Sequence, residues 1–352
     1  MFNAACTTLT KLCDSTNFRP SSNMQRFAPS HRALSRLVSF NRVPRRTLAN
    51  VSADILRDTS TPSAPPMSPL STRGSPANLQ NGLATYRRSF PPLTGLTSHI
   101  RFNPASDSSF APQRAVSQFI SSLHAHFDTL PSDPHAPASA ARFRQYSRAV
   151  VLPFEDKPRV YWSPGHFKDG QDITYYNQGV FNPEHNSERR AMPSIPESMH
   201  HGLLEKLILT DVALCDWSVD ELRHPIIVGV HFIKTAPTEE HPVSKTTPNS
   251  LHQDGHKFSF VHLVQRRNAI GGENVIAAQG GRYSGLQPSE VPAEDVLARF
   301  YLESPLDTWA AYDAKCSHYA GPVMQEVPGP EPSERSVIIC DIEPMVAAVC
   351  PI

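Results

Sequence analysis

The chain has 352 residues and no net formal charge, and 39% of its residues are hydrophobic. This length is sufficient for one large domain with additional segments. The basic residues lack the aromatic interleaving of a nucleic-acid groove, and no apolar run approaches the roughly 18 residues of a membrane span. The sequence therefore predicts a soluble protein that binds neither nucleic acid nor membrane.

Residues 1–80 are rich in Ser, Thr and Pro and carry ten Lys/Arg against three Asp/Glu, which predicts a disordered basic leader. Within it, residues 24–46 contain six arginines and no acidic residue, as is typical of a mitochondrial transit segment. A basic tail without a targeting role is the alternative. The six cysteines form no CxxC pair, which favours a reducing compartment. We expect a cytoplasmic or mitochondrial protein, and nothing in the sequence specifies an oligomeric state.

Residues 81–352 are predicted to form the globular domain. Residues 112–127 carry apolar side chains at helical spacing and begin with a proline, so they should form a helix with one buried face. Residues 141–152 read as a strand, and residues 161–193 as a long polar loop. A second helix is expected over residues 196–214, whose leucines and isoleucine form a broad apolar stripe.

The second half of the chain is predicted to consist of strands. Residues 225–234 are apolar and β-branched and contain His231, which in a buried strand is more often a packing residue than a ligand-binding one. Further short strands are expected over residues 257–264, 273–278, 306–312 and 335–341. Because no long helices alternate with them, the pattern favours an antiparallel β core with flanking helices.

His252 and Asp254 are two residues apart at the start of one of these strands, so their side chains should point to the same side. His318 follows a later strand and can supply a third ligand. Two imidazoles and one carboxylate on one face are the ligand set of non-haem Fe(II) oxygenases, which leaves positions open for a cosubstrate and O2. The sequence therefore predicts an iron site formed by His252, Asp254 and His318.

Arg335 lies 17 residues after His318, near the start of the last predicted strand. A guanidinium in this position can pair with the distal carboxylate of 2-oxoglutarate when the keto-acid end of the cosubstrate binds the metal. The glycine pair Gly271-Gly272 marks a close turn between the two halves of the site. We therefore expect Arg335 to bind the cosubstrate.

These motifs resemble those of the Fe(II)- and 2-oxoglutarate-dependent dioxygenases that include bacterial free isoleucine hydroxylases. The resemblance covers residues 140–345 and is carried by Arg144-Gln-Tyr-Ser-Arg148, Tyr176-Asn-Gln-Gly-Val-Phe-Asn182, His252-Gln-Asp-Gly255, Arg266-Arg-Asn-Ala-Ile-Gly-Gly-Glu273, residues 313–318 and Arg335. The sequence departs from many such enzymes at Val337, where a hydroxyl residue often follows the arginine by two positions.

The resemblance implies a double-stranded β-helix, a jelly-roll or cupin-like fold with flanking helices. It also implies the cofactors Fe(II), 2-oxoglutarate and O2, and a free aliphatic L-amino acid similar to valine or isoleucine as the small-molecule substrate. In such enzymes 2-oxoglutarate is decarboxylated to succinate, and a ferryl species then removes hydrogen from an unactivated C–H bond. The product would be a hydroxylated amino acid or, as in related fungal enzymes of secondary metabolism, an aziridine formed by C–N ring closure.

A free amino acid needs partners for its carboxylate and its ammonium group. The candidates for the carboxylate are Arg189, Arg190 and Tyr176, and those for the ammonium group are Glu273 and Asp341. Asp341 would share a strand face with Arg335, and Gln178 and Asn268 are further candidates. Surface ion pairs are an equally good explanation for the charged residues of this set. The product could depend on side chains near Ile342 and Met345.

Two other functions use the same residues. A catalytically silent cupin-like protein could keep the fold and a metal without turnover, although it would have no need for an anion partner such as Arg335. A zinc hydrolase could use His252, Asp254 and His318 as zinc ligands, and its turnover would not depend on 2-oxoglutarate.

Overall fold

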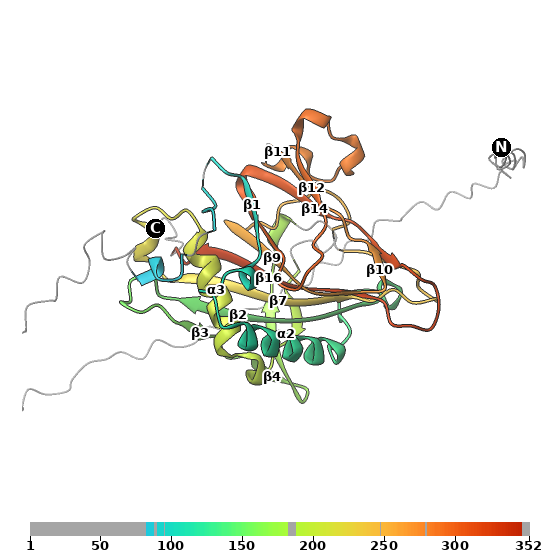
Figure 1. Cartoon of the computed structure of the whole chain (residues 1–352), viewed down its shortest axis with the longest axis horizontal. Helices are drawn as coiled ribbons and strands as arrows, with labels where there is room; N and C mark the ends of the chain where they lie inside the picture. Colours follow the sequence, from blue (N-terminus) through green and yellow to red (C-terminus); the bar gives the residue numbers. More distant parts are fainter. Residues whose placement is uncertain are drawn as a thin grey trace, which may run out of the picture. The chain divides into compact units, whose positions relative to one another are not determined.

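A computed structural model describes residues 82–87, 90–94, 96–181, 188–246, 248–278 and 280–346. The predicted leader, with its possible transit segment, lies outside the described residues. Figure 1 shows a mainly β domain in which helices cover one face of a large sheet. This arrangement confirms the predicted fold class, a mainly β double-stranded β-helix (jelly-roll) core with flanking helices. None of the described helices is long and apolar enough to cross a membrane.

The main sheet has seven strands, and all of its pairs are antiparallel. In spatial order the strands are β1 (His99–Phe102), β13 (Thr308–Tyr312), β9 (Phe258–Arg267), β16 (Glu334–Pro344), β7 (Ile226–Thr235), β2 (Arg142–Val151) and β3 (Val160–Trp162). Four strands of the second half of the sequence form the centre of this sheet, and strands of the first half lie at both edges. The sheet therefore pairs residues that are as far apart in the chain as His99 and Ala311.

Three smaller sheets complete the described part of the domain. The first contains β12 (Val296–Phe300), β11 (Asn274–Ala278) and β14 (Cys316–Ala320), the second β10 (Ala269–Gly271), β15 (Val323–Gln325) and β8 (Val243–Ser244), and the third β4 (His166–Lys168), β5 (Gln171–Tyr176) and β6 (Arg190–Pro193). Short 3-10 helices lie between strands: η1 (Pro104–Ser106), η2 (Ala138–Ala140), η3 (Gly179–Phe181), η5 (Glu197–Met199), η6 (Glu221–Arg223), η7 (Gly280–Tyr283), η8 (Pro288–Glu290), η9 (Ala293–Asp295) and η10 (Asp313–Lys315).

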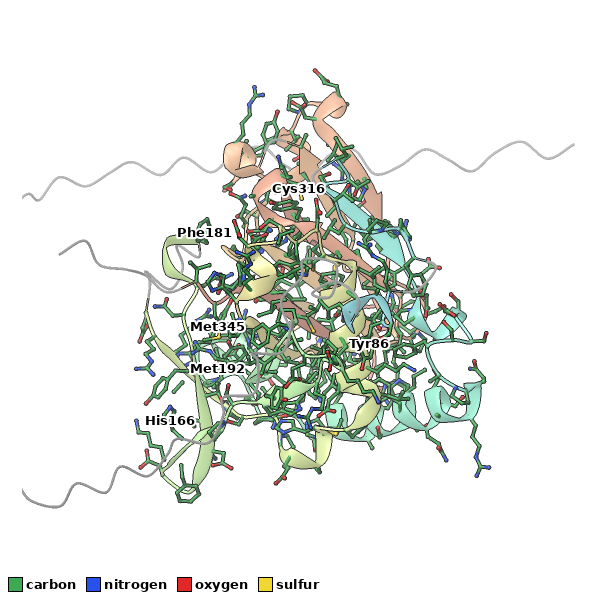
Figure 2. All side chains as sticks on the ribbon, turned by 90° about the vertical axis from the view of Figure 1, so that its left-hand side faces the viewer. Tyr86, His166, Phe181, Met192, Cys316 and Met345 are labelled. Carbon is green, nitrogen blue, oxygen red and sulfur yellow. The ribbon has the colours of Figure 1, made fainter. Side chains whose placement is uncertain are left out.

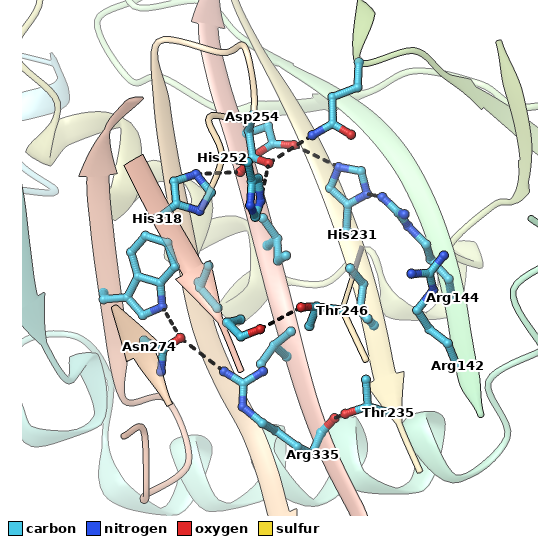
Figure 3. A pocket seen from close by; sticks show the side chains of 18 of the residues that line it. Arg142, Arg144, His231, Thr235, Thr246, His252, Asp254, Asn274, His318 and Arg335 are labelled. Atoms are coloured by element: carbon cyan, nitrogen blue, oxygen red, sulfur yellow. Dashed lines mark hydrogen bonds and ion pairs between the residues drawn. The ribbon is translucent and has the colours of Figure 1, made fainter. Parts of the chain in front are cut away.

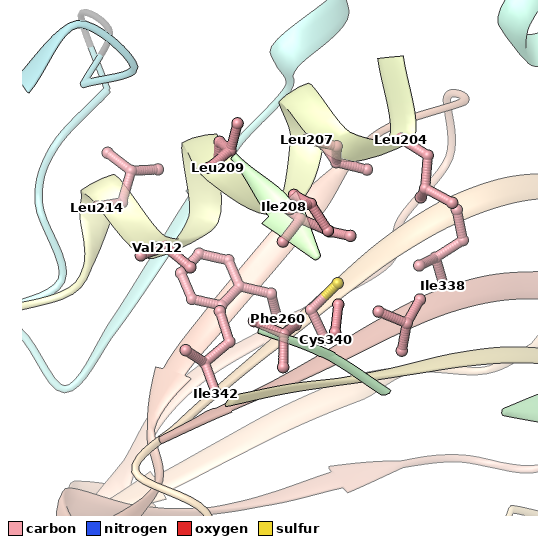
Figure 4. Packing of buried hydrophobic residues seen from close by; sticks show 14 of the residues in the cluster. Leu204, Leu207, Ile208, Leu209, Val212, Leu214, Phe260, Ile338, Cys340 and Ile342 are labelled. Atoms are coloured by element: carbon pink, nitrogen blue, oxygen red, sulfur yellow. The ribbon is translucent and has the colours of Figure 1, made fainter. Parts of the chain in front are cut away.

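Two helices cover the outer face of the main sheet. Helix α2 (Gln113–Asp128) buries the predicted stripe, and α3 (Gly202–Leu214) is buried along most of its length. In Figure 4, Ile208 of α3 lies near Cys340 of β16, and Leu204 lies near Ile338 of the same strand. Because successive residues of a strand point to opposite faces, the even-numbered residues of β16 face the helices and the odd-numbered ones face away from them.

The predicted helices and strands agree with the structure to within a few residues, with two exceptions. The segment predicted as a loop over residues 161–193 contains the strands β4, β5 and β6. Asp169 and Gly170 both have positive φ, 51° and 83°, and an Asp-Gly pair of this kind makes a two-residue hairpin turn. Figure 2 shows this hairpin sheet, in which Met192 is buried and β4, which includes His166, is exposed.

The second exception is the helix expected over residues 196–214. It is divided into η5 and α3, and the His201 side chain accepts a hydrogen bond from the Leu203 amide at the start of α3. The prediction that side chains near Ile342 influence the product is not supported for Ile342 itself. This residue has an even position on β16, so its side chain lies in the core under the helices.

Candidate metal centre and cavity

A cavity lies on the face of the main sheet opposite the helices, and its empty volume is about 860 Å³, including the open solvent at its mouth. Its floor is formed by odd-numbered residues of β16 together with their neighbours on β7 and β2 (Figure 3). Residues 274, 318 and 320 of β11 and β14 form the opposite wall.

Strand register determines which side chains meet on this floor, because each residue of β16 pairs with a residue of β7, which in turn pairs with a residue of β2. From one end of the floor to the other, these rows are Arg335–Thr235–Arg142, Val337–Ile233–Arg144, Ile339–His231–Tyr146 and Asp341–Gly229–Arg148. Gly229 leaves space for the Tyr146 ring, since an added β carbon would lie 3.1 Å from the Tyr146 hydroxyl. The floor is thus a series of rows that begins with arginines at one end and reaches Asp341 at the other.

His252, Asp254 and His318 converge at one side of the cavity, as Figure 3 shows. His252 and His318 form an isolated β-bridge, with two backbone hydrogen bonds of 2.9 Å. Asp254 Oδ1 lies 3.6 Å from His252 Nε2, and Asp254 Oδ2 lies 3.4 Å from His318 Nε2. One ligand atom from each residue lies within 4.8 Å of the other two.

The chemistry of these three residues fits an iron ion. The Nδ1 atom of His252 lies 2.8 Å from the Ser250 carbonyl oxygen, which can only accept a hydrogen bond. Nδ1 therefore carries the proton, and the lone pair of Nε2 is free to bind a metal. Two neutral imidazoles and a carboxylate make up the facial ligand set of non-haem Fe(II).

Asp313 supports this centre and was not identified from the sequence. Its carboxylate accepts hydrogen bonds from the backbone amides of Asp254, at 3.0 Å, and Gly255, at 2.9 Å. It also lies 3.2 Å from His318 Nε2. Burial lowers the pKa of His318, but the carboxylates of Asp254 and Asp313 outweigh this effect and raise the pKa to about 9. A metal ion at Nε2 would replace this proton.

Arg335 lies in the same cavity and is 4% exposed. Its Nε has no hydrogen-bond partner among the described residues, and its Nη2 makes one long contact of 3.5 Å with Asn274 Oδ1. Burial, together with the charge of Arg266, lowers the pKa of Arg335 to about 10. Gly272 packs on this arginine, because a β carbon at position 272 would lie 2.8 Å from Arg335 Cδ. Arg335 is therefore a buried cation that has no anionic partner in the part of the chain that the structure describes.

Position 337, where many related enzymes carry a hydroxyl residue, is a valine here, and other residues supply the polar lining of the cavity. Val337 lines the cavity as an apolar residue, whereas Asn274 and Thr246 line it as polar ones. Trp309 Nε1 donates a 3.0 Å hydrogen bond to Asn274 Oδ1 and so orients this amide. Neither Asn274 nor Thr246 was identified from the sequence.

A second polar group surrounds His231, which is 1% exposed. Arg144 Nη2 lies 2.8 Å from His231 Nδ1, and His231 Nε2 lies 3.1 Å from Asp341 Oδ2. Since a guanidinium only donates, His231 accepts at Nδ1 and donates at Nε2. Burial, supported by the charge of Arg144, lowers the pKa of His231 well below its ordinary value, so the ring is neutral. Burial raises the pKa of Asp341.

The predicted substrate residues fall into two groups. Tyr176, Gln178 and Asp341 line the cavity, and Gln178 donates a 3.0 Å hydrogen bond to Asp254 Oδ1. Arg190 is buried behind them, with its Nη2 3.4 Å from Gln178 Oε1. The structure brings these four residues close to the candidate metal ligands.

Arg189, Asn268 and Glu273 do not reach the cavity. Arg189 is exposed and lies over the Tyr175 ring, and the Asn268 side chain is bonded to the backbone of Val327. Glu273 forms an ion pair of 3.2 Å with Arg299. Its neighbour Asn274 points into the cavity, so Glu273 points to the opposite face of β11.

A second group of potential ligands, Asp211, His262 and Cys340, lies in the core under α3. His262 Nε2 is 2.9 Å from Asp211 Oδ2, and His262 Nδ1 is 2.8 Å from Thr308 Oγ1. These are hydrogen-bond distances and leave no space for an ion between the two side chains. This group is a buried hydrogen-bond network.

Residues 124–341 match the family described as 2OG-Fe dioxygenase, a stretch of more than half of the chain. The chain belongs to this family. It is accordingly a non-haem iron dioxygenase that depends on 2-oxoglutarate, and its cofactors are Fe(II), 2-oxoglutarate and O2. The donor set of His252, Asp254 and His318 is compatible with this family. A comparison of the dioxygenase with curated protein sequences gives no match.

Several solved structures share the fold of this dioxygenase. IDO from Bacillus thuringiensis is 16% identical, with a TM-score of 0.50 over 76% of this chain and 99% of that chain. A bsmA homolog from Methylobium petroleophilum PM1 is 18% identical, with a TM-score of 0.52 over 70% and 89%. The Fe(II)/α-ketoglutarate-dependent dioxygenase TqaL is 13% identical, with a TM-score of 0.50 over 78% and 89%. At these identities the similarity concerns the fold alone.

Proposed function

We propose that the dioxygenase oxidises a free aliphatic L-amino acid similar to valine or isoleucine, with Fe(II) held by His252, Asp254 and His318 and 2-oxoglutarate held by Arg335. The product is a hydroxylated amino acid or an aziridine formed by C–N ring closure. The observation that supports this proposal best is that one cavity is lined by the ligand set, by a buried carboxylate and by a buried guanidinium that forms no ion pair with the described residues.

Arg335 suits the distal carboxylate of 2-oxoglutarate. A buried cation without an anion is unfavourable, and a carboxylate in the cavity would supply both charge and hydrogen-bond acceptors. The bound cofactors supply the chemistry that decarboxylates 2-oxoglutarate to succinate and removes a hydrogen atom from an unactivated C–H bond. The residues of the chain hold both reactants and exclude water from the cavity.

Asp341 suits the ammonium group of the substrate. It lines the cavity, and Ser259 Oγ lies between it and the candidate metal ligand, 3.1 Å from Asp341 Oδ1 and 3.2 Å from Asp254 Oδ2. An ammonium group beside Asp341 would therefore be close to the metal. Val261, Val337, Ile339 and Trp309 line the same cavity and offer an apolar surface for an aliphatic side chain.

The test is an aerobic incubation of the full chain with Fe(II), 2-oxoglutarate and a panel of L-amino acids, with succinate and product mass as readouts. We expect aliphatic amino acids to increase succinate formation. Hydroxylation would add one oxygen atom to the amino acid, and ring closure or desaturation would remove two hydrogen atoms, which NMR would distinguish. Turnover with zinc that persists without 2-oxoglutarate would contradict the proposal.

A further inference from the structure

We propose that Arg144, oriented by His231, binds the α-carboxylate of the amino-acid substrate, with Tyr176 and Arg190 completing the anion site. This inference rests on the proposed function, because it assigns the remaining charged group of an α-amino acid. It is carried by two buried guanidinium groups, those of Arg144 and Arg190, that form no ion pair with a carboxylate of the described residues, and by the connection of Arg144 to Asp341 through His231.

The first observation is the contrast between Arg142 and Arg144, which lie two residues apart on the same face of β2 and both line the cavity. Arg142 is neutralised inside the protein, since its Nε lies 2.8 Å from Asp133 Oδ2. Arg144 is 8% exposed, its Nε has no hydrogen-bond partner, and its Nη2 contacts the neutral ring of His231. Among the described residues, no carboxylate forms an ion pair with Arg144.

The second observation is a like-charged neighbour. Arg144 Cζ lies 5.2 Å and Arg190 Cζ 4.9 Å from the centroid of the Tyr176 ring. Arg190 is 1% exposed, and its Nε also lacks a partner. Burial and the charge of Arg144 lower the pKa of Arg190 to about 10. Two buried cations around one ring are unfavourable unless an anion binds between or beside them.

The third observation identifies the type of anion. His231 connects Arg144 to Asp341, so the proposed sites for carboxylate and ammonium are joined by one side chain. Tyr176 lines this cavity, and its hydroxyl can donate a hydrogen bond to a carboxylate. An α-amino acid carries its carboxylate and its ammonium group on the same carbon, which matches the guanidinium of Arg144 and the carboxylate of Asp341 held by the two nitrogens of one imidazole.

Sheet register separates this site from the cosubstrate site. Arg335 aligns with Arg142, whereas Arg144 aligns with Val337, two positions along β16 toward Asp341. The guanidinium groups of Arg335 and Arg144 therefore lie in different rows of the cavity floor. We assign the row of Arg335 to 2-oxoglutarate and the row of Arg144 to the substrate.

The experiment measures binding without turnover. Under anaerobic conditions, the full chain with Fe(II) and 2-oxoglutarate is titrated with the best amino acid from the panel and with the amine that lacks its carboxylate, and binding is followed by the visible absorption of the iron–cosubstrate complex. In the wild type the amino acid should bind far more tightly than the amine. In Arg144→Gln the Kd of the amino acid should rise about 100-fold, whereas the Kd of the amine should not rise.

Two further variants separate this role from a loss of structure. Arg144→Lys retains the charge but not the bidentate geometry and should recover part of the discrimination between amino acid and amine. Arg189→Gln removes an exposed arginine from the same region and should leave both Kd values at their wild-type level. Circular dichroism and thermal unfolding would verify that each variant is folded.

The outcomes separate two failures. If Arg144→Gln discriminates between amino acid and amine as well as the wild type does, the assignment of Arg144 is wrong. The assignment is equally wrong if the variant weakens 2-oxoglutarate binding and leaves the amino acid unaffected. If the wild type binds 2-oxoglutarate but none of the amino acids on the panel, the proposed function fails, and the inference fails with it.

Discussion

Replacing Arg335 by methionine should lower the affinity for 2-oxoglutarate and raise the stability of the metal-free protein. The variant should bind 2-oxoglutarate more weakly, because the distal carboxylate loses its only proposed cationic partner. The metal-free variant should nevertheless be more stable than the wild type, because Arg335 is 4% exposed and has no anion among the described residues. Methionine fills a similar volume with an apolar side chain.

The magnitudes follow from the burial of this group. Loss of one partner from a buried charge pair costs about 2–5 kcal/mol, which corresponds to an increase in Kd of about 30-fold to 5000-fold. Replacement of a buried charge by an apolar residue of similar volume stabilises a protein by about 1–4 kcal/mol. The long 3.5 Å contact with Asn274 opposes this gain, and it is the guanidinium's one hydrogen bond to a described residue.

The assays are an anaerobic titration of the Fe(II)-loaded protein with 2-oxoglutarate and urea unfolding without iron and cosubstrate. Arg223→Met is a control, since Arg223 is 58% exposed and pairs at 3.3 Å with Asp220, which is 88% exposed. This variant should change either quantity by less than about 1 kcal/mol. A Kd for 2-oxoglutarate in Arg335→Met that is close to the wild-type value would refute the assignment of the cosubstrate site.

Three other predictions test the surroundings of the site. Alanine at either candidate histidine ligand should abolish turnover and stoichiometric Fe(II) binding, measured by anaerobic titration and metal analysis. Gly272→Ala should weaken 2-oxoglutarate binding although residue 272 is not proposed to contact the cosubstrate. The reason is that position 272 has a φ of +65° and that an added β carbon would displace Arg335. Asp133→Asn should cost about 3 kcal/mol of unfolding free energy at pH 7, since it leaves Arg142 without its buried partner. Burial opposes the ionisation of Asp133, but Arg142 and Arg144 lower its pKa below 3.8, so its contribution is lost as the pH falls through that lowered pKa. The difference in unfolding free energy between Asp133→Asn and the wild type should therefore shrink in acid, and a constant difference would contradict this explanation.

Local sequence patterns predicted the strands β2, β7, β9, β11, β13 and β16 to within a few residues but not the shorter strands. They also indicated the candidate ligands His252, Asp254 and His318, which lie close together in the structure. The alternation of β16 places Arg335, Val337, Ile339 and Asp341 on one face, and all four line the cavity. The same alternation, applied to residue 342, would have directed Ile342 to the core. Asp169-Gly170 was a readable hairpin signal within the segment that was predicted as a loop.

The neighbours of these residues could not be predicted locally, because they depend on long-range register. Arg144 and His231 meet through the pairing of β2 with β7, whose strands are about 80 residues apart in the chain. Asn274 reaches Arg335 through a turn with positive φ at Gly271 and Gly272, and the direction of its side chain after such a turn is not a sequence pattern. The same turn explains why Glu273, which was predicted to bind the substrate, pairs with Arg299 instead of lining the cavity.

The most direct test of the proposed function is the ratio of succinate to oxidised amino acid, measured for the wild type with each aliphatic L-amino acid in the presence of Fe(II), 2-oxoglutarate and O2. If the amino acid is held by its ammonium and carboxylate groups beside the metal, the two products should form in equal amounts with at least one of them. Succinate formation that no free amino acid increases, with every amino acid recovered unchanged, would contradict the account.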